Sequence, residues 1–184
     1  MEIVCSTDSK YIMPTGIMLT SLFESNRGEV VNVHLLHDYD SAELLDPIRT
    51  IAARYQQTIH FYLISDEIFK YFPVGLDFQV DHVGSSFATY YRLYLTEILP
   101  ADIDKVIYLD GDILVVDKLV KLWNTSVENY AIAAVPDSYN NNIEHSYHSE
   151  HPRCLPIGWL RGCLLAEHCG HNLCLYLRAK EPPL

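Results

Sequence analysis

Short apolar runs alternate with helical segments along the first 135 residues, and this alternation constrains the fold more than any other feature of the sequence. The runs are of strand size, and most are rich in β-branched or aromatic residues, which suit a pleated and partly buried surface. We therefore predict strands at Glu2–Ser6, Val30–Leu36, Thr58–Ile64, Lys105–Leu109 and Tyr130–Val135.

Helical segments separate these runs. The first helix begins near Pro14, since a missing N–H is tolerated there, and its predicted apolar face carries Ile17, Met18, Leu19, Leu22 and Phe23. Ser41 is the predicted N-cap of a second helix, which carries Leu44, Leu45, Ile48, Ile51 and Ala52. A short helix is expected from Ser65-Asp66 to near Pro73, and another over Ser86–Leu99, before Pro100. This order predicts an α/β fold with a largely parallel sheet.

Composition limits the class of protein. The chain has 184 residues, 49% hydrophobic and 20% charged, as expected for one globular domain. Its net charge of −11 disfavours a nucleic-acid partner, because phosphate backbones select clustered Lys and Arg. The apolar runs are too short for a transmembrane segment. The start, Met1-Glu2-Ile3-Val4, lacks the basic region of a secretory signal, so we expect a cytoplasmic protein.

The charge is unevenly distributed. Residues 1–139 hold 20 acidic and 9 basic side chains and so carry the whole −11, whereas residues 140–184 hold four of each. The tail also holds four of the five cysteines and five of the nine histidines, and it has no clear strand pattern. Such a shift indicates a domain boundary, a metal module or a segment outside its normal reading frame.

Two strand ends carry residues suited to chemistry, and in open α/β sheets ligands bind beyond the carboxyl ends of strands. The loop Ser6–Tyr11 follows the first predicted strand, and Asp110-Gly111-Asp112 follows the fourth. Residues i and i+2 of an extended chain face the same way, so both aspartates can point at one Mg²⁺ or Mn²⁺. Gly111 leaves room for a ligand near the backbone. The alternative is a solvated turn, which is common in an acidic chain.

Three segments in this order resemble glycosyltransferase family 8, the retaining enzymes that include glycogenin and bacterial lipopolysaccharide galactosyl- and glucosyltransferases. Glu2–Gly16 resembles the family's opening strand and nucleotide loop, and Ser85–Leu93 resembles the helix with an arginine that faces the nucleotide sugar. Asp104–Val116, continued by Leu119 and Leu122-Trp123, resembles the metal segment. The resemblance implies a GT-A-like fold: a Rossmann-like, mixed but mostly parallel sheet flanked by helices.

The resemblance also implies a role for each matched residue. Ser6 and Asp8 would contact the ribose and uracil of a UDP-sugar, Tyr11 would flank the uracil, and Lys10 stands where relatives often have asparagine. Arg92 would hold the diphosphate or the donor sugar. Asp110 and Asp112, with Gly111 between them, would bind the Mn²⁺ or Mg²⁺ that bridges the diphosphate. The implied reaction moves a hexose from UDP-glucose or UDP-galactose to a saccharide or glycolipid with retention, with peripheral membrane contact where the acceptor is a lipid. No catalytic nucleophile is assigned.

The resemblance covers residues 1–137 and fades in residues 138–184. Relatives continue with an Asn-Ala-Gly-type segment, an Asp-Gln pair and a late histidine as third metal ligand, none of which is found here; Arg161–Leu165 is the nearest echo. We therefore expect an incomplete copy with little or no turnover. The tail is interpreted as truncated or frameshifted, as a genuine divergent end, or as a zinc site formed from Cys154, Cys163, His168, Cys169, His171 and Cys174.

Two other functions fit the same residues. Asp-X-Asp after an apolar strand also opens haloacid-dehalogenase-type phosphatases, in which the first aspartate is the nucleophile and the second a general acid. That motif normally follows the first strand, whereas Asp110 lies in the middle of this chain. The second alternative is a fragment that binds UDP without turnover.

Overall fold

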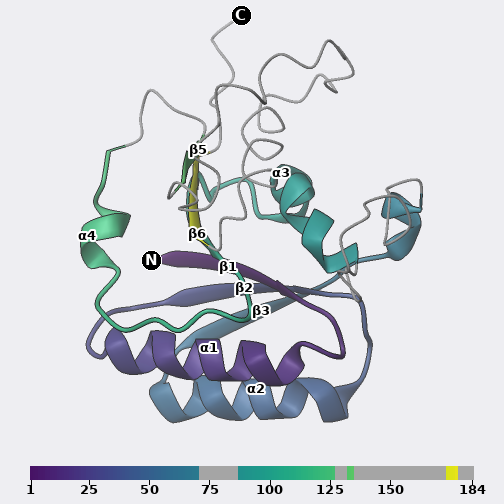
Figure 1. Ribbon diagram of the computed structural model, residues 1–184, viewed down its shortest axis with the longest axis horizontal. Helices are drawn as coiled ribbons and strands as arrows, with labels where there is room; N and C mark the ends of the chain where they lie inside the picture. Colours follow the sequence, from purple (N-terminus) through teal and green to yellow (C-terminus); the bar gives the residue numbers. More distant parts are fainter. Residues whose placement is uncertain (71–86, 127–131, 135–172, 178–184) are drawn as a thin grey trace, which may run out of the picture.

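A computed structural model describes residues 1–70, 87–126, 132–134 and 173–177 of the 184-residue chain. A six-stranded sheet lies at its centre, with strand order β3-β2-β1-β4-β6-β5 (Figure 1). The strands are β1 (Glu2–Thr7), β2 (Asn32–His37), β3 (Thr58–Leu63), β4 (Lys105–Leu109), β5 (Ile132–Ala134) and β6 (Leu173–Leu177). All five predicted strands are present.

Four of the strands run parallel. β1 pairs in parallel with β2 on one side and β4 on the other, so that Val4 lies opposite both His34 and Tyr108, and β2 continues the parallel arrangement to β3. The prediction of a largely parallel sheet is confirmed. As a result, the carboxyl ends of β1 and β4, which are followed by the two predicted site segments, lie next to each other at the same end of the sheet.

The remaining two strands are antiparallel. β6 pairs with β4, and β5 pairs with β6. β6 comes from the tail, where no strand pattern was predicted, so that prediction was wrong. Its sequence, Leu-Cys-Leu-Tyr-Leu, is a short and nearly continuous apolar run, which periodicity alone does not distinguish from other buried segments.

Two long helices, α1 (Ile12–Ser25) and α2 (Ala42–Tyr55), lie side by side on one face of the sheet (Figure 1). Met18, Leu19, Leu22 and Phe23 of α1 are buried against the sheet, as predicted. Ile17 is 58% exposed, so its predicted place on this face was wrong. Ser41 occupies the N-cap position of α2, although its side chain makes no capping hydrogen bond.

Shorter helical segments cover the other face. They are the 3₁₀ segments η1 (Asp66–Phe69) and η2 (Phe87–Tyr94), followed by α3 (Leu95–Ile98). Phe69, Tyr91 and Leu95 pack there with Val4 and Tyr108. The predicted helix over Ser86–Leu99 is thus helical but mostly 3₁₀, with a single α-helical turn at its end. Another single turn, α4 (Val120–Trp123), follows β4.

Several predictions fall on residues outside the described ranges. The end of the helix predicted to reach Pro73 lies there, as do the proposed zinc ligands of the tail except Cys174, which belongs to β6. None of the helices in the described part of the chain combines the length and apolarity needed to cross a bilayer.

Two histidines of β2, His34 and His37, are buried. His34 is 2% exposed; its Nε2 lies 2.9 Å from the Glu2 carboxylate and its Nδ1 lies 3.0 Å from the Tyr62 hydroxyl. Burial lowers the pKa of His34 from its usual 6.5, and Glu2 only partly opposes this. Burial likewise lowers the pKa of His37.

We therefore expect the free energy of unfolding to fall as the pH drops below about 6.5, because the unfolded chain binds protons that the folded histidines do not. His34→Gln should reduce the slope of stability against pH between about 7.5 and about 5.5. Urea midpoints of the wild type and the variant at each pH measure this, and their difference cancels the other titrating groups. An unchanged slope in the variant would contradict the assignment to His34.

Candidate functional site

A hydrogen bond joins the two strands that carry the predicted site segments. Ser6 at the end of β1 and Tyr108 in β4 share a hydrogen bond of 2.5 Å between their hydroxyl oxygens. Tyr108 is fully buried, and burial raises the pKa of its phenol, so it remains a neutral hydroxyl. A hydrogen bond between side chains thus links the carboxyl ends of β1 and β4 directly.

Arg92 and Asp110 form a largely buried ion pair beside this bond. Arg92 Nη2 donates to Asp110 Oδ1 at 2.9 Å, and the two side chains are 9% and 20% exposed. Arg92 Nε donates to the Thr89 carbonyl at 3.0 Å, and its guanidinium lies 4.5 Å from the centre of the Tyr108 ring. The 3₁₀ segment η2 thus holds the arginine in one place, against the end of β4.

Burial raises the pKa of Asp110, and the charge of Asp112 raises it further, while Arg92 opposes both effects. The Arg92 guanidinium is therefore the positive charge that compensates a carboxyl group in a poorly solvated place. Asp112, by contrast, is exposed to solvent. The charges of the two predicted metal ligands thus affect each other, although one side chain is mostly buried and the other is exposed.

Gly111 lies buried between the two aspartates, against helix α1. A Cβ at this position would lie 2.5 Å from Thr15 Oγ1. Thr15 cannot easily move, because it is fully buried and its hydroxyl donates to Thr7 Oγ1 at 3.0 Å. The structure thus corrects the reason for the glycine: the missing side chain makes room for α1, whereas the sequence had suggested room for a ligand.

The loop after β1 is organised by Asp8. Its Oδ1 accepts the backbone N–H groups of Lys10 at 2.8 Å and Tyr11 at 2.9 Å, just before α1 begins. Asp8 itself is buried, Lys10 is exposed, and Tyr11 is 46% exposed. The roles predicted for Ser6, Asp8, Lys10 and Tyr11 toward a nucleotide stay predictions.

Three residues of this region were missed from the sequence. Tyr108 joins Ser6 to Arg92, and the available signal was its position in β4, two residues before Asp110. Thr15 fixes Gly111 and carried no signal. Tyr39 follows β2, and its buried hydroxyl lies close to Thr7.

The donor set fits a hard divalent cation in part. Asp110 and Asp112 supply carboxylate oxygens, which Mg²⁺ and Mn²⁺ prefer. Within residues 1–70, 87–126 and the two short strands, no cluster of three or more His, Cys, Asp or Glu side chains is arranged to hold a metal. A cation here would therefore need further ligands, such as phosphate oxygens.

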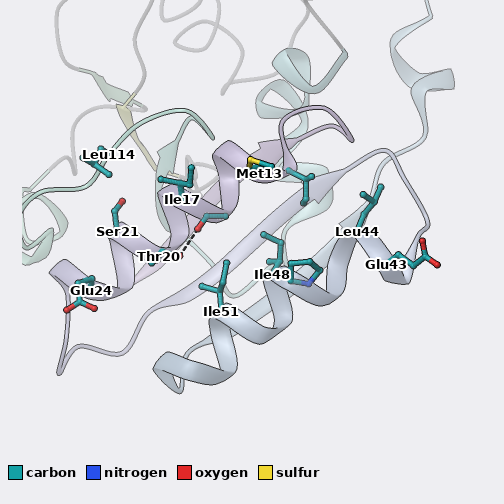
Figure 2. Close-up of a pocket in the computed structure, with 13 residues that line it drawn as sticks. Met13, Ile17, Thr20, Ser21, Glu24, Glu43, Leu44, Ile48, Ile51 and Leu114 are labelled. Carbon is teal, nitrogen blue, oxygen red and sulfur yellow. Dashed lines mark hydrogen bonds between the residues drawn. The ribbon is translucent and has the colours of Figure 1, made fainter.

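An apolar hollow lies elsewhere, between α1 and α2, with a volume of about 650 Å³ (Figure 2). Its lining includes Met13, Ile17, Leu44, Ile48 and Ile51, together with Leu114 from beyond β4. The Thr20 hydroxyl in its wall already donates to the Gly16 carbonyl at 2.8 Å. None of the predicted site residues lines it, and most of its lining side chains are apolar.

Residues 2–168 match the profile of the family described as glycosyl transferase family 8. A Haemophilus influenzae protein described as a glycosyltransferase is 30% identical over 147 residues, which is 80% of this chain and 42% of that protein. The lipopolysaccharide 1,2-glucosyltransferase of Escherichia coli is 30% identical over 107 residues, 58% of this chain and 30% of that enzyme. The chain thus spans less than half the length of these curated relatives.

Solved structures of LgtC share the fold. An active-site mutant of LgtC aligns with a TM-score of 0.64 and 30% identity, covering 76% of this chain and 47% of that one. The galactosyltransferase LgtC with donor and acceptor sugar analogues aligns with a TM-score of 0.70 and 24% identity, covering 96% and 58%. The prediction of a GT-A-like α/β fold is confirmed.

The contact between Gly111 and Thr15 predicts the effect of a single methyl group. Gly111→Ala should destabilise the chain by about 1–3 kcal/mol, as overpacking of a tight contact does. Gly16→Ala is the matched control, because its new Cβ would meet only Ile51 at 3.4 Å and Ile48 at 3.6 Å, and alanine favours a helix.

Thermal or urea unfolding of both variants measures the difference. Adding Thr15→Ala to Gly111→Ala should recover part of the loss, because the next atoms near the new methyl, the Ser6 carbonyl oxygen and the Thr15 Cβ, are both 3.6 Å away. If Gly111→Ala unfolds like the wild type, the close approach of α1 is wrong.

Proposed function

The chain belongs to glycosyl transferase family 8, and on that premise we propose that it forms the donor-binding part of a hexosyltransferase that uses a UDP-sugar. The observation that carries this proposal is the Arg92–Asp110 pair at the end of β4, beside the loop that follows β1. It puts a fixed guanidinium against the first of two closely spaced carboxylates, a combination that suits a metal-bound diphosphate.

The loop after β1 is proposed to bind the uridine. Tyr11 offers an exposed ring on which a base can stack, and Lys10 offers an exposed cation. Ser6 keeps a partly exposed hydroxyl beside Tyr108. One carboxylate oxygen of Asp8 accepts hydrogen bonds from backbone N–H groups of the loop. The other oxygen is therefore the one proposed to contact the nucleoside.

Asp110 and Asp112 are proposed to hold Mn²⁺ or Mg²⁺, and Arg92 to bind the diphosphate. When bound, such an ion supplies electrostatic stabilisation of the UDP leaving group. The planar fork of Arg92 suits phosphate oxygens, because its donors are always charged. No residue of the chain is proposed as a nucleophile, and the family resemblance supports transfer with retention.

The acceptor is proposed to be a saccharide or glycolipid, and the donor UDP-glucose or UDP-galactose. The support is the name of the E. coli relative, a lipopolysaccharide glucosyltransferase, and that of LgtC, a galactosyltransferase. Such acceptors go with a cytoplasmic enzyme that contacts the membrane only peripherally. A boundary between the donor-binding part and the tail is proposed at residue 137, although β6 of the tail pairs with β4 in the same sheet.

The other two functions differ in their support. The phosphatase reading needs Asp110 as an open nucleophile, yet its Oδ1 is bound by a buried arginine, and the family match argues against it. The reading as a UDP-binding fragment without turnover is compatible with the same site. A UDP-release assay with UDP-glucose or UDP-galactose and Mn²⁺ separates it from an active transferase.

The exposed Asp112 provides a test of the metal that leaves the fold intact. Asp112→Asn should reduce the Mn²⁺-dependent part of UDP affinity by about tenfold or more, because an amide is a weaker cation ligand than a carboxylate. Asp117→Asn, another exposed aspartate of the same loop, should bind like the wild type. Calorimetry with and without Mn²⁺ gives both values, and an unchanged Mn²⁺ effect in Asp112→Asn would reject the metal assignment.

The loop after β1 should also select the base. UDP should bind at least about tenfold more tightly than ADP or GDP, since a site that hydrogen-bonds a base rejects others by leaving its polar groups unpaired. Competition calorimetry at constant Mn²⁺ measures this, because the diphosphate contribution is then shared. Equal affinities for the three nucleotides would mean that Ser6–Tyr11 only connects β1 to α1.

A further inference from the structure

A buried cation already pairs with one of the two carboxylates proposed to bind the metal. We propose that Arg92 makes metal binding conditional on the diphosphate: it disfavours a divalent cation at Asp110 when the site holds no phosphate, and favours the cation and the diphosphate together. This inference rests on the proposed function, which assigns the metal to Asp110 and Asp112.

The geometry keeps Arg92 beside Asp110. Its Nε is held by the Thr89 carbonyl at 3.0 Å, its guanidinium rests on the Tyr108 ring, and the side chain is 9% exposed. A swing into solvent would break this hydrogen bond and leave Asp110 as an uncompensated buried charge, which is costly. The guanidinium therefore stays within a few ångströms of any cation that binds Asp110.

A divalent cation without phosphate then meets an unfavourable field. One oxygen of Asp110 already accepts a hydrogen bond from Arg92, whose positive charge offsets that of the carboxylate. A divalent cation at Asp110 is also repelled by the guanidinium at short range in a poorly solvated place. Asp112 is exposed to water, so its attraction is screened. The two carboxylates therefore attract a divalent cation more weakly than their two formal negative charges suggest.

A diphosphate reverses this balance. Its negatively charged oxygens attract both the metal ion and the Arg92 guanidinium. A guanidinium can bind two of these oxygens in one plane. The repulsion between metal and Arg92 becomes a shared attraction to the phosphates. Because coupling between two ligands is reciprocal, the metal and UDP must raise each other's affinity by the same factor.

A structural role for Arg92 predicts the opposite sign. Groups that hydrogen-bond a metal-ligating carboxylate usually orient it, and their loss weakens metal binding. If Arg92 acts only in that way, neutral replacements bind Mn²⁺ alone more weakly than the wild type. The affinity for Mn²⁺ in the absence of nucleotide therefore distinguishes the two roles without any assay of turnover.

The experiment is an electron paramagnetic resonance titration of the full chain with Mn²⁺, with and without UDP. Arg92→Gln and Arg92→Met remove the charge, and the unbranched methionine retains packing against the Tyr108 ring if the glutamine variant does not fold. Arg92→Lys is the matched control that retains the charge but loses the planar fork. Circular dichroism and melting temperature select the variants that fold like the wild type.

The neutral variants should bind Mn²⁺ alone roughly tenfold more tightly than the wild type, and UDP should raise that affinity by a smaller factor than in the wild type. Arg92→Lys should stay close to the wild type for Mn²⁺ alone. Unchanged or weaker binding of Mn²⁺ alone by the neutral variants would overturn the inference.

Two measurements on the wild type complete the test. Wild-type chain that binds Mn²⁺ as tightly alone as with UDP overturns the coupling, whatever the variants do. Wild-type chain that binds no Mn²⁺ even with UDP rejects the proposed function itself. The failure of the inference and the failure of the metal site are thus separate results.

Discussion

The parallel pairing of β1 with β4 brings together the two loops that carry most groups of the candidate site. It places Val4 opposite Tyr108 and so brings Ser6 within hydrogen-bonding distance of the Tyr108 hydroxyl. The same pairing lets α1, which leaves the end of β1, cross beside Asp110-Gly111-Asp112 and press Thr15 against Gly111. A different strand order would separate the two loops, and neither would form a site alone.

Buried polar groups at this edge form one connected set. Ser6 bonds Tyr108, the Tyr108 ring supports Arg92, and Arg92 bonds Asp110. A buried network is stable only when its members are satisfied, since an unpaired buried charge is expensive. The set therefore fixes each side chain through its neighbour, and a ligand that engages Arg92 or Asp110 changes the electrostatics of both.

The elements of the parallel core could be predicted because local pattern and tertiary role agree there. β1, β2, β3 and β4 are apolar runs between clear turn signals, and the two aspartates follow such a run directly. The strand β6 could not be predicted, because its short, nearly continuous apolar run has no strand alternation and lies in a tail without a regular order of strands and helices. Thr15 could not be predicted either, because a small residue inside a helix gains its role only from what packs on it. The helical periodicity placed Ile17 on the buried face wrongly, because Ile17 lies at the margin of that face, where the side chain is exposed.

The two aspartates carry different weights because their surroundings differ. Asp110 balances a buried guanidinium, so its replacement by asparagine leaves Arg92 without its counter-charge and harms folding together with any metal binding. Asp112 faces water and is outside the buried ion pair, so its replacement leaves the contact between Arg92 and Asp110 in place. A loss of function after a change at Asp110 therefore does not by itself identify a metal ligand, whereas the same loss at Asp112 does. Variants of Asp112 therefore test the binding chemistry of the motif, whereas variants of Asp110 test the buried structure that supports it.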